Sequence, residues 1–498
     1  MKKFLQNNPL FLFLLPVFFV EHGFLENYGF ISPGEALLLL PGYIAAAAIL
    51  FLCLQLFFKN TVKSALLASW ILAFYLFFGA LHDWLLQHAG FFHKYTVILT
   101  LFLLSTVLLA IYFLKTKRSL QTMALFLNIL LLIYLSADLG QIFWKWLYPP
   151  TDKFNVYPFA ANSQYIPCAE CPKPDIYFLL FDEYESSSSL RKYHHYDNSS
   201  LDSFLTQKDF SLQYGSMSNY NFTPFSMASI LNMSYLDGIH FPDVVSADDY
   251  NHCATLIRDN KVIEILSQEG YEIVNYSIFD LAGNPSVVDE SFLPLKTKLI
   301  TGRTFYSQFM KDAGWRLYTG RFNIRWLSKY NLFTTLENNN RLIQLVEQES
   351  KRKTLQPRFI YAHLYMPHPP FYYNRYGVLK SKTMIGAENQ EKPPQAYVDY
   401  LPYTNSKVKE LINTVRQNTH DSAVIIFMGD HGFRYADQTI EGDFNFRNQH
   451  AVYFPDRDYH LLYDSMTSVN TFRIVFDKLF RQQFPLLKDS VIFLRDKK

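Results

Sequence analysis

The sequence predicts five membrane-spanning helices followed by an α/β domain whose mostly parallel central sheet is covered by helices. An uneven charge distribution is the first reason: residues 1–150 hold only 14 of the 90 Asp, Glu, Lys and Arg residues in the 498-residue chain. The second is that, in the remainder, continuous apolar runs alternate with helical patterns, which is typical of a parallel sheet. We expect the helices within 1–146, a connector within 147–174 and the α/β domain within 175–498.

Composition excludes several classes of protein. Charged residues make up 18% of the chain, against about 25% in an average soluble domain, so a simple soluble enzyme and a disordered chain are both excluded. The formal net charge of +2 gives no basis for a nucleic-acid partner, which usually needs a basic domain. Four cysteines are too few for a scaffold built on disulfides.

Five apolar stretches reach or approach the length of about 20 residues that a membrane helix needs. They are residues 9–20, 36–58, 64–81, 95–114 and 120–143. The first is short and, taken alone, resembles the apolar core of a signal peptide. Because no small-residue cleavage site follows it and four further apolar stretches do, we interpret it as a retained span.

Basic residues in the connecting loops predict the orientation of these spans. They occur before the first span, between the second and third, and between the fourth and fifth: Lys2, Lys3, Lys59, Lys63, Lys115, Lys117 and Arg118. Basic loops are usually cytoplasmic, so the N-terminus is predicted inside and the α/β domain outside. Asp138 lies near the predicted outer end of the fifth span, and both a functional and a structural role stay open for it.

The connector carries six prolines between 148 and 174, together with Cys168 and Cys171 in a Cys-x-x-Cys motif. A redox motif would need a helix after it, and a lone Cys-x-x-Cys is only half of a zinc site. We therefore expect a small local disulfide in an oxidising compartment.

Four short apolar runs predict the strands of the sheet: residues 176–181, 271–276, 358–364 and 423–428. Residues 261–268 and 406–417 have helical periodicity and precede two of them. In parallel sheets of this kind, ligands bind beyond the carboxyl ends of the strands. The residues that follow each strand are therefore the candidates for a site.

Acidic residues and histidines follow three of these strands. Asp182 and Glu183 follow the first, and Asp430 and His431 follow the fourth in a Gly-Asp-His-Gly sequence. Each acidic cluster alone is explained by helix capping, but two clusters at equivalent strand ends favour a metal site. Carboxylate and imidazole ligands suit Zn²⁺ or Mn²⁺, with Mg²⁺ or Ca²⁺ as further candidates.

The third strand carries His363 and leads to His368, which we interpret as substrate or metal contacts. A different candidate lies between the first two strands, where Pro224 predicts a helix start and Thr223 is expected at its N-cap. Thr223 is then either a capping residue or a nucleophile activated by a metal and a helix N-terminus.

The order of these motifs resembles the alkaline phosphatase superfamily, and more narrowly the sulfatase-like membrane enzymes, namely phosphoethanolamine transferases and lipoteichoic acid synthases. The resemblance implies five spans followed by an extracytoplasmic catalytic domain. It implies Asp182, Asp430 and His431 as metal ligands, with Glu183 as a second carboxylate. It also implies Thr223 as nucleophile and metal contact.

The same resemblance implies substrate-binding roles for His363, His368 and His450, the last of which precedes an apolar strand in Asn-Gln-His-Ala-Val. Two departures stand out. True sulfatases carry a Cys or Ser that becomes a formylglycine, whereas this chain has Thr223 and no matching Arg. The transferases usually have glutamate in place of Asp182.

The function that follows is a metal-dependent hydrolase or transferase of cell-envelope phosphate esters, with phosphoethanolamine-type headgroup transfer through a covalent threonine as the leading form. A sulfuric ester hydrolase and an inactive envelope binding protein of this fold are the alternatives. The expected partners are the bilayer itself and a membrane lipid or envelope glycan substrate, with no nucleic acid.

Overall fold

The structure, a computed structural model, describes residues 2–148, 154–156, 165–240, 242–288, 297–312, 332–435 and 441–496. The chain forms two compact units. One comprises Met1–Thr151 with Pro294–Asn323, and the other comprises Asp152–Leu293 with Ile324–Lys498. The sequence prediction placed 175–498 in one continuous domain, whereas packing assigns the segment around residue 300 to the first unit.

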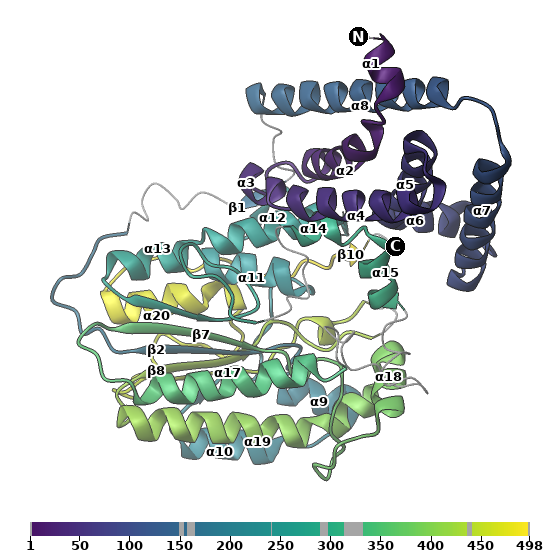
Figure 1. The fold of residues 1–498 in the computed structure, drawn as a ribbon. Coiled ribbons are helices and arrows are strands. Elements are labelled where there is room, and N and C mark those ends of the chain that lie inside the picture. Colours follow the sequence, from purple (N-terminus) through teal and green to yellow (C-terminus); the bar gives the residue numbers. More distant parts are fainter. Residues whose placement is uncertain are drawn as a thin grey trace. The chain divides into compact units, whose positions relative to one another are not determined.

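The first unit is entirely helical in its described residues (Figure 1). Its helices are α1 (Lys2–Asn7), α2 (Phe11–Glu26), α3 (Pro33–Leu37), α4 (Leu40–Phe58), α5 (Thr61–Leu76), α6 (Phe78–His88), α7 (Tyr95–Lys115), α8 (Gln121–Leu147), α14 (Lys298–Thr301) and α15 (Phe305–Asp312). Most of their side chains are apolar, including many that lie on the outside of the unit.

The prediction of five membrane spans is wrong for the described residues. Three helices are long and apolar enough to cross a membrane, Pro33–Phe58, Tyr95–Lys115 and Gln121–Leu147, or up to four if one bent pair counts as a span. The predicted first span lies in α2, whose 16 residues extend only about 24 Å at about 1.5 Å per residue. The predicted span 64–81 is broken after Leu76, where α5 and α6 meet at 60°.

Polar side chains hold the N-terminal helices to α8. The amide of Asn128 donates to the carbonyl oxygens of Leu5 and Asn8 and accepts from the N–H of Phe11. Asp138 is buried and lies 2.9 Å from His22 Nδ1. Polar groups in an apolar environment need such partners, so Asp138 has a structural partner, and a functional role for it stays a prediction.

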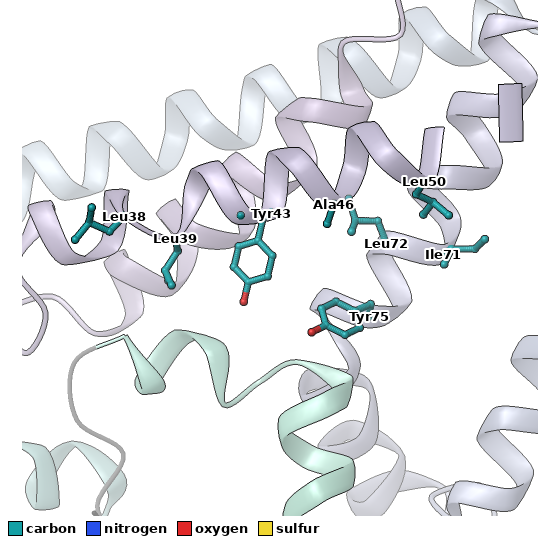
Figure 2. Close-up of a pocket in the computed structure, with 9 residues that line it drawn as sticks. Leu38, Leu39, Tyr43, Ala46, Leu50, Ile71, Leu72 and Tyr75 are labelled. Carbon is teal, nitrogen blue, oxygen red and sulfur yellow. The ribbon is translucent and has the colours of Figure 1, made fainter. Parts of the chain in front are cut away.

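A cavity of about 580 Å³ lies between α4 and α5. Its lining is aliphatic apart from Tyr43 and Tyr75, whose rings project into the space between the two helices (Figure 2). It belongs wholly to the helical unit.

The segment that holds α14 and α15 packs onto the helices of the first unit. The N–H of Gly79 donates to the carbonyl oxygen of Arg303 over 2.8 Å, and Arg303 Nη1 lies 2.8 Å from Asp83 Oδ2. Phe305 contacts the ring of Phe78 edge-on at 4.9 Å. This close backbone approach requires a residue without Cβ at position 79.

The second unit is built on a mixed, mostly parallel sheet in the order β3-β9-β8-β2-β7-β6. Its strands are β2 (Ile176–Phe181), β3 (Ser211–Leu212), β6 (Glu272–Tyr276), β7 (Arg358–Leu364), β8 (Val424–Gly429) and β9 (His450–Tyr453). The four strands predicted from apolar runs are β2, β6, β7 and β8, and they pair in parallel as expected. Only β9 and β3 are antiparallel.

Helices cover both faces of this sheet, so its strands have continuous apolar runs. One face carries α9 (Ser187–His194), α10 (Ser199–Gln207), α17 (Thr334–Lys351) and α19 (Pro394–Thr419), and the other carries α11 (Thr223–Asn232), α12 (Ala247–Arg258), α13 (Lys261–Gln268) and α20 (Thr471–Phe480) (Figure 1). Outside these layers lie α18 (Lys382–Glu391), the pair β1 (Asn155–Val156) with β4 (Leu236–Asp237), and the pair β5 (Val244–Val245) with β10 (Arg495–Asp496). Two short 3₁₀ turns complete the described elements, η2 (Asp443–Asn445) and η3 (Ser468–Asn470).

The connector between the units holds the predicted local disulfide. Cys168 and Cys171 are bonded to each other. Lys173 in the same connector forms an ion pair of 2.7 Å with the buried Glu269. These contacts tie the end of the connector to the second unit just before β2.

We expect Gly79→Ala to loosen the segment around Arg303. A Cβ at position 79 would lie 2.8 Å from the Arg303 carbonyl oxygen, and overpacking of this kind costs about 1–3 kcal/mol. Trypsin cleavage after Arg303 in the detergent-purified protein should therefore accelerate. Gly140→Ala is the matched control, because Gly140 is also helical and its Cβ would meet nothing within 4 Å. Equal cleavage rates in the two variants would contradict the packing described here.

Candidate active site

The strand register brings two acidic residues together at the carboxyl edge of the sheet. Phe181 at the end of β2 pairs with Gly429 at the end of β8, so the next residues, Asp182 and Asp430, leave the sheet side by side. His431 follows Asp430, and ligand atoms of these three side chains all lie within 4.8 Å of one another. All three side chains are fully buried, and no mobile surface group is involved.

The cluster carries more negative charge than its neighbours balance. Asp182 Oδ1, Asp430 Oδ2 and Glu183 Oε2 are buried and have no hydrogen-bond partner in the described part of the chain. Burial raises the pKa of Asp182 well above its usual value, and the nearby Asp430 and Glu183 raise it further. Unsatisfied carboxylate oxygens facing one another fit a divalent cation, and the donor set of two carboxylates and one imidazole suits Zn²⁺ or Mn²⁺.

His431 presents an unprotonated nitrogen to the centre of the cluster. Its Nδ1–H donates to the carbonyl oxygen of Gly432 over 2.7 Å, which leaves the lone pair on Nε2. Burial, followed by the charge of Arg434, lowers the pKa of His431 to about 3, so the ring is neutral. Nε2 lies 3.3 Å from Asp430 Oδ2 and 3.1 Å from the hydroxyl of Thr223.

Thr223 is the first residue of α11, and it does not cap that helix. The N-cap position belongs to Phe222, and the expectation of a capping role for Thr223 is therefore wrong. The Thr223 hydroxyl is buried and donates instead to His431 Nε2. Three residues on, Ser226 Oγ donates to the carbonyl oxygen of Asp430 over 2.6 Å, which fixes the start of α11 against the loop after β8.

Glu183 has a strained backbone at the edge of the cluster. Its φ of 62° lies in the left-handed region that non-glycine residues rarely adopt. Its N–H donates to Asp430 Oδ1 over 2.9 Å, while the carbonyl oxygen accepts from Tyr397. The backbone turn therefore supports Asp430, and the Glu183 side chain remains beside the cluster.

The other predicted residues divide into those near the cluster and one away from it. His363 Nε2 lies 3.1 Å from Asp182 Oδ2, and because a carboxylate accepts, this ring donates to the candidate ligand. His368 lies 4.0 Å from Glu183 and accepts from Tyr365. His450 is buried in β9 with its ring nitrogens bonded to Gln213 and Thr471, so no described contact joins it to the cluster, and its substrate role stays a prediction.

Two cations at the site were not predicted. Arg434 Nε lies 3.0 Å from Glu183 Oε1, and its guanidinium lies 5.2 Å from the ring centre of Phe222, next to Thr223. Lys392 follows α18 and is partly buried, and burial lowers the pKa of its ammonium. Arg434 stands only four residues after Asp430 in the sequence, so proximity to that motif was a usable signal, whereas nothing local marked Lys392.

Residues 260–479 match the family model described as Sulfatase. Over these residues the chain is similar to a sulfatase domain. The matched residues include Asp430, His431, His363 and His368, while Asp182 and Thr223 precede them. The match covers 220 of the 498 residues and shows similarity to sulfatases over that stretch.

Several solved structures show a distant likeness to part of this chain. The C-terminal periplasmic domain of EptC from Escherichia coli is 9% identical with a TM-score of 0.38, and the alignment covers 67% of this chain and 94% of that one. The corresponding domain of phosphoethanolamine transferase EptC from Campylobacter jejuni is 12% identical, with 64% and 94% covered and a TM-score of 0.38. Phosphonate monoester hydrolase of Agrobacterium radiobacter is 13% identical, with 62% and 74% covered and a TM-score of 0.36. No curated protein matches the chain in sequence.

We expect Asp430→Asn and His431→Gln each to lower metal binding by the second unit at least about tenfold, since even the loss of residues that only support a metal site costs about 10–100-fold. Metal content is measured by mass spectrometry on the full-length protein after dialysis against Zn²⁺ or Mn²⁺. His450→Gln is the control, because His450 is an equally buried histidine outside the cluster. Retention of metal by His431→Gln, or equal loss in His450→Gln, would show that the ligand assignment is wrong.

Proposed function

We propose that the chain is a metal-dependent enzyme that transfers or hydrolyses phosphate esters of the cell envelope through a covalent intermediate on Thr223. The main observation that supports this proposal is the position of the Thr223 hydroxyl. It lies 3.1 Å from the neutral His431 Nε2 and beside the buried carboxylate cluster. The Thr223 hydroxyl makes no capping bond and is therefore free to react. Helix N-termini attract anions, so an anionic ester would bind beside this hydroxyl.

A balanced reaction follows from these groups. Thr223 Oγ forms a bond to phosphorus while the bond from phosphorus to the leaving oxygen breaks, and the proton lost by Thr223 ends on the leaving alcohol. A second alcohol, or water, then attacks phosphorus, gives its proton to Thr223 Oγ and releases Thr223. A bound divalent cation would lower the pKa of the hydroxyl and offset charge on the phosphoryl oxygens.

Arg434 is suited to stabilise the charge on the phosphoryl group. Only its Nε bonds Glu183, and within the described residues its two Nη groups have no hydrogen-bond partner. Burial lowers its pKa, but Glu183 and the neighbouring acids raise it more, so the net shift is upward. The side chain therefore keeps its charge and has donors left for phosphoryl oxygens.

The leading form of this proposal is transfer of a phosphoethanolamine-type headgroup from a membrane lipid to an envelope glycan or lipid. The family match favours sulfuric ester hydrolysis as the second candidate. Thr223 stands against it, because threonine cannot become the aldehyde on which true sulfatases depend. An inactive binding protein would keep the metal but turn over neither phosphate nor sulfate esters, so paired assays with both ester types separate the three.

We further propose that the N-terminus lies inside the cell and the second unit outside, facing the periplasm of a bacterial-type envelope. Lys63 Nζ donates to the carbonyl oxygen of Thr116 over 2.9 Å, so the two basic loops after α4 and after α7 lie at the same end of the helices. Basic loops at one end favour a cytoplasmic location for that end. From there α8 leads away to the other side.

We expect Thr223→Ala to lower turnover by several orders of magnitude. Folding and metal binding should persist, because Asp182, Asp430 and His431 remain. Thr223→Ser should recover part of the activity, since it keeps an attacking oxygen. Turnover is measured with a chromogenic phosphate ester, and the phospho-adduct is sought on residue 223 by mass spectrometry after acid quench. Full turnover by folded Thr223→Ala would leave metal-activated water as the nucleophile.

We expect Arg434→Gln to lower kcat by about 10²–10³, the usual cost of one lost donor at a developing oxyanion. Metal content should stay unchanged. Arg375→Gln is the control, because Arg375 also pairs with an acid, Asp399 at 2.5 Å, but on the exposed surface. A purely structural Arg434 would instead lower the melting temperature and leave the kcat of the folded fraction intact.

A further inference from the structure

A cavity of about 420 Å³ adjoins the carboxylate cluster within the second unit. Its walls come from the segment after β6, from α17, from the turn after β7 and from the end of α18. His363 and His368 form part of its lining, and the same two side chains contact Asp182 and Glu183. The cavity is therefore separated from the proposed reacting centre by one layer of side chains, a distance suited to the rest of a substrate.

Among the described residues, the lining has no acidic side chain and a single lysine, Lys392. The Lys392 ammonium has neither an ion pair nor a hydrogen bond to any residue that the structure describes. By contrast, Lys380, just before the same helix, pairs with Glu388 over 2.6 Å. Glu183 and Asp182 act on this ammonium electrostatically without forming a described ion pair with it. A partly buried ammonium with no direct ion pair favours an anionic ligand.

The remaining polar groups of the cavity suit hydroxyls. The cavity is also lined by Thr335, Asn338 and Asn389. Their side chains make no hydrogen bond with the described residues, so one hydroxyl, two amide N–H₂ groups and two amide carbonyls are available to a ligand. Asn339 is different, since both ends of its amide bond the backbone of Tyr365. It holds the Tyr365 hydroxyl against His368.

We propose that this cavity is a subsite for an anionic, hydroxyl-rich group of acidic-sugar or phosphosugar type on the acceptor, with Lys392 pairing the anion. We expect a cationic group such as an ammonium to bind less well there, because Lys392 repels it and the described lining residues include no carboxylate. The proposal rests on the proposed function, since it takes the adjacent cluster as the reacting centre. It goes further by assigning a ligand class to a separate set of residues.

The experiment uses full-length Thr223→Ala protein in detergent, so that no turnover interferes. Binding of four probes is measured by calorimetry: glucuronate, glucose 6-phosphate, glucose and glucosamine. Both anions should bind more tightly than glucose, and glucosamine least. Adding Lys392→Met should weaken both anions roughly tenfold to a hundredfold, as expected for a lost charge-assisted contact, and leave glucose unchanged.

Lys353→Met is the matched control, because Lys353 is an exposed lysine of the same unit and should leave all four affinities unchanged. Lys392→Asn is a second variant that tolerates the left-handed backbone at this position, where φ is 44°. Glucose 6-phosphate alone responding to Lys392→Met would assign the subsite to phosphosugars, and glucuronate responding as well would extend it to acidic sugars.

Glucosamine binding as tightly as glucuronate, no binding of either anion, or unchanged affinities in both Lys392 variants would each overturn the proposal. The readout is binding without turnover. Loss of the covalent Thr223 mechanism would therefore leave a positive Lys392 result standing, and a negative Lys392 result would leave the Thr223 mechanism untouched.

Discussion

Repulsion among three buried carboxylates is the constraint on which the second unit depends. Asp182, Glu183 and Asp430 are fully buried at one edge of the sheet, and two unit charges about 4 Å apart interact by about 4 kcal/mol at an effective dielectric of about 20. Arg434 compensates one of them, and the backbone N–H of Glu183 supports another. The remainder requires a proton or a cation, so a structure that buries these groups is organised to hold positive charge.

The same constraint explains how the candidate nucleophile is placed. Every residue of α11 is buried, and Ser226 ties its first turn to the backbone beside Asp430. The Thr223 hydroxyl therefore has a position set by packing on two elements rather than by a loop. His431 Nδ1 is bonded to the carbonyl oxygen of Gly432. Its Nε2 therefore has one lone pair, which is available either to that hydroxyl or to a cation.

The helical unit is held together by different interactions from those of the second unit. Its outward side chains are largely apolar, and two of its buried polar side chains, Asp138 and Asn128, have partners on the N-terminal helices. A segment from the second half of the chain completes its packing through Arg303 against Gly79 and Asp83. Sequence order and packing order therefore differ, since a segment about 150 residues beyond α8 belongs to the same unit.

The sequence by itself determined the features that depend on local pattern. Apolar runs located the four parallel strands, and adjacency to their ends located Asp182 and Asp430, because in a parallel sheet those ends share one edge. Only the tertiary structure decided which distant side chains meet. Arg434 meets Glu183, which lies 251 residues earlier in the chain. His450 pairs with Met428 close to the same edge of the sheet, but its ring bonds Gln213 and Thr471 and makes no described contact with the cluster. The span count also needed the fold, since a composition pattern does not show where a helix such as α2 ends or where α5 bends into α6.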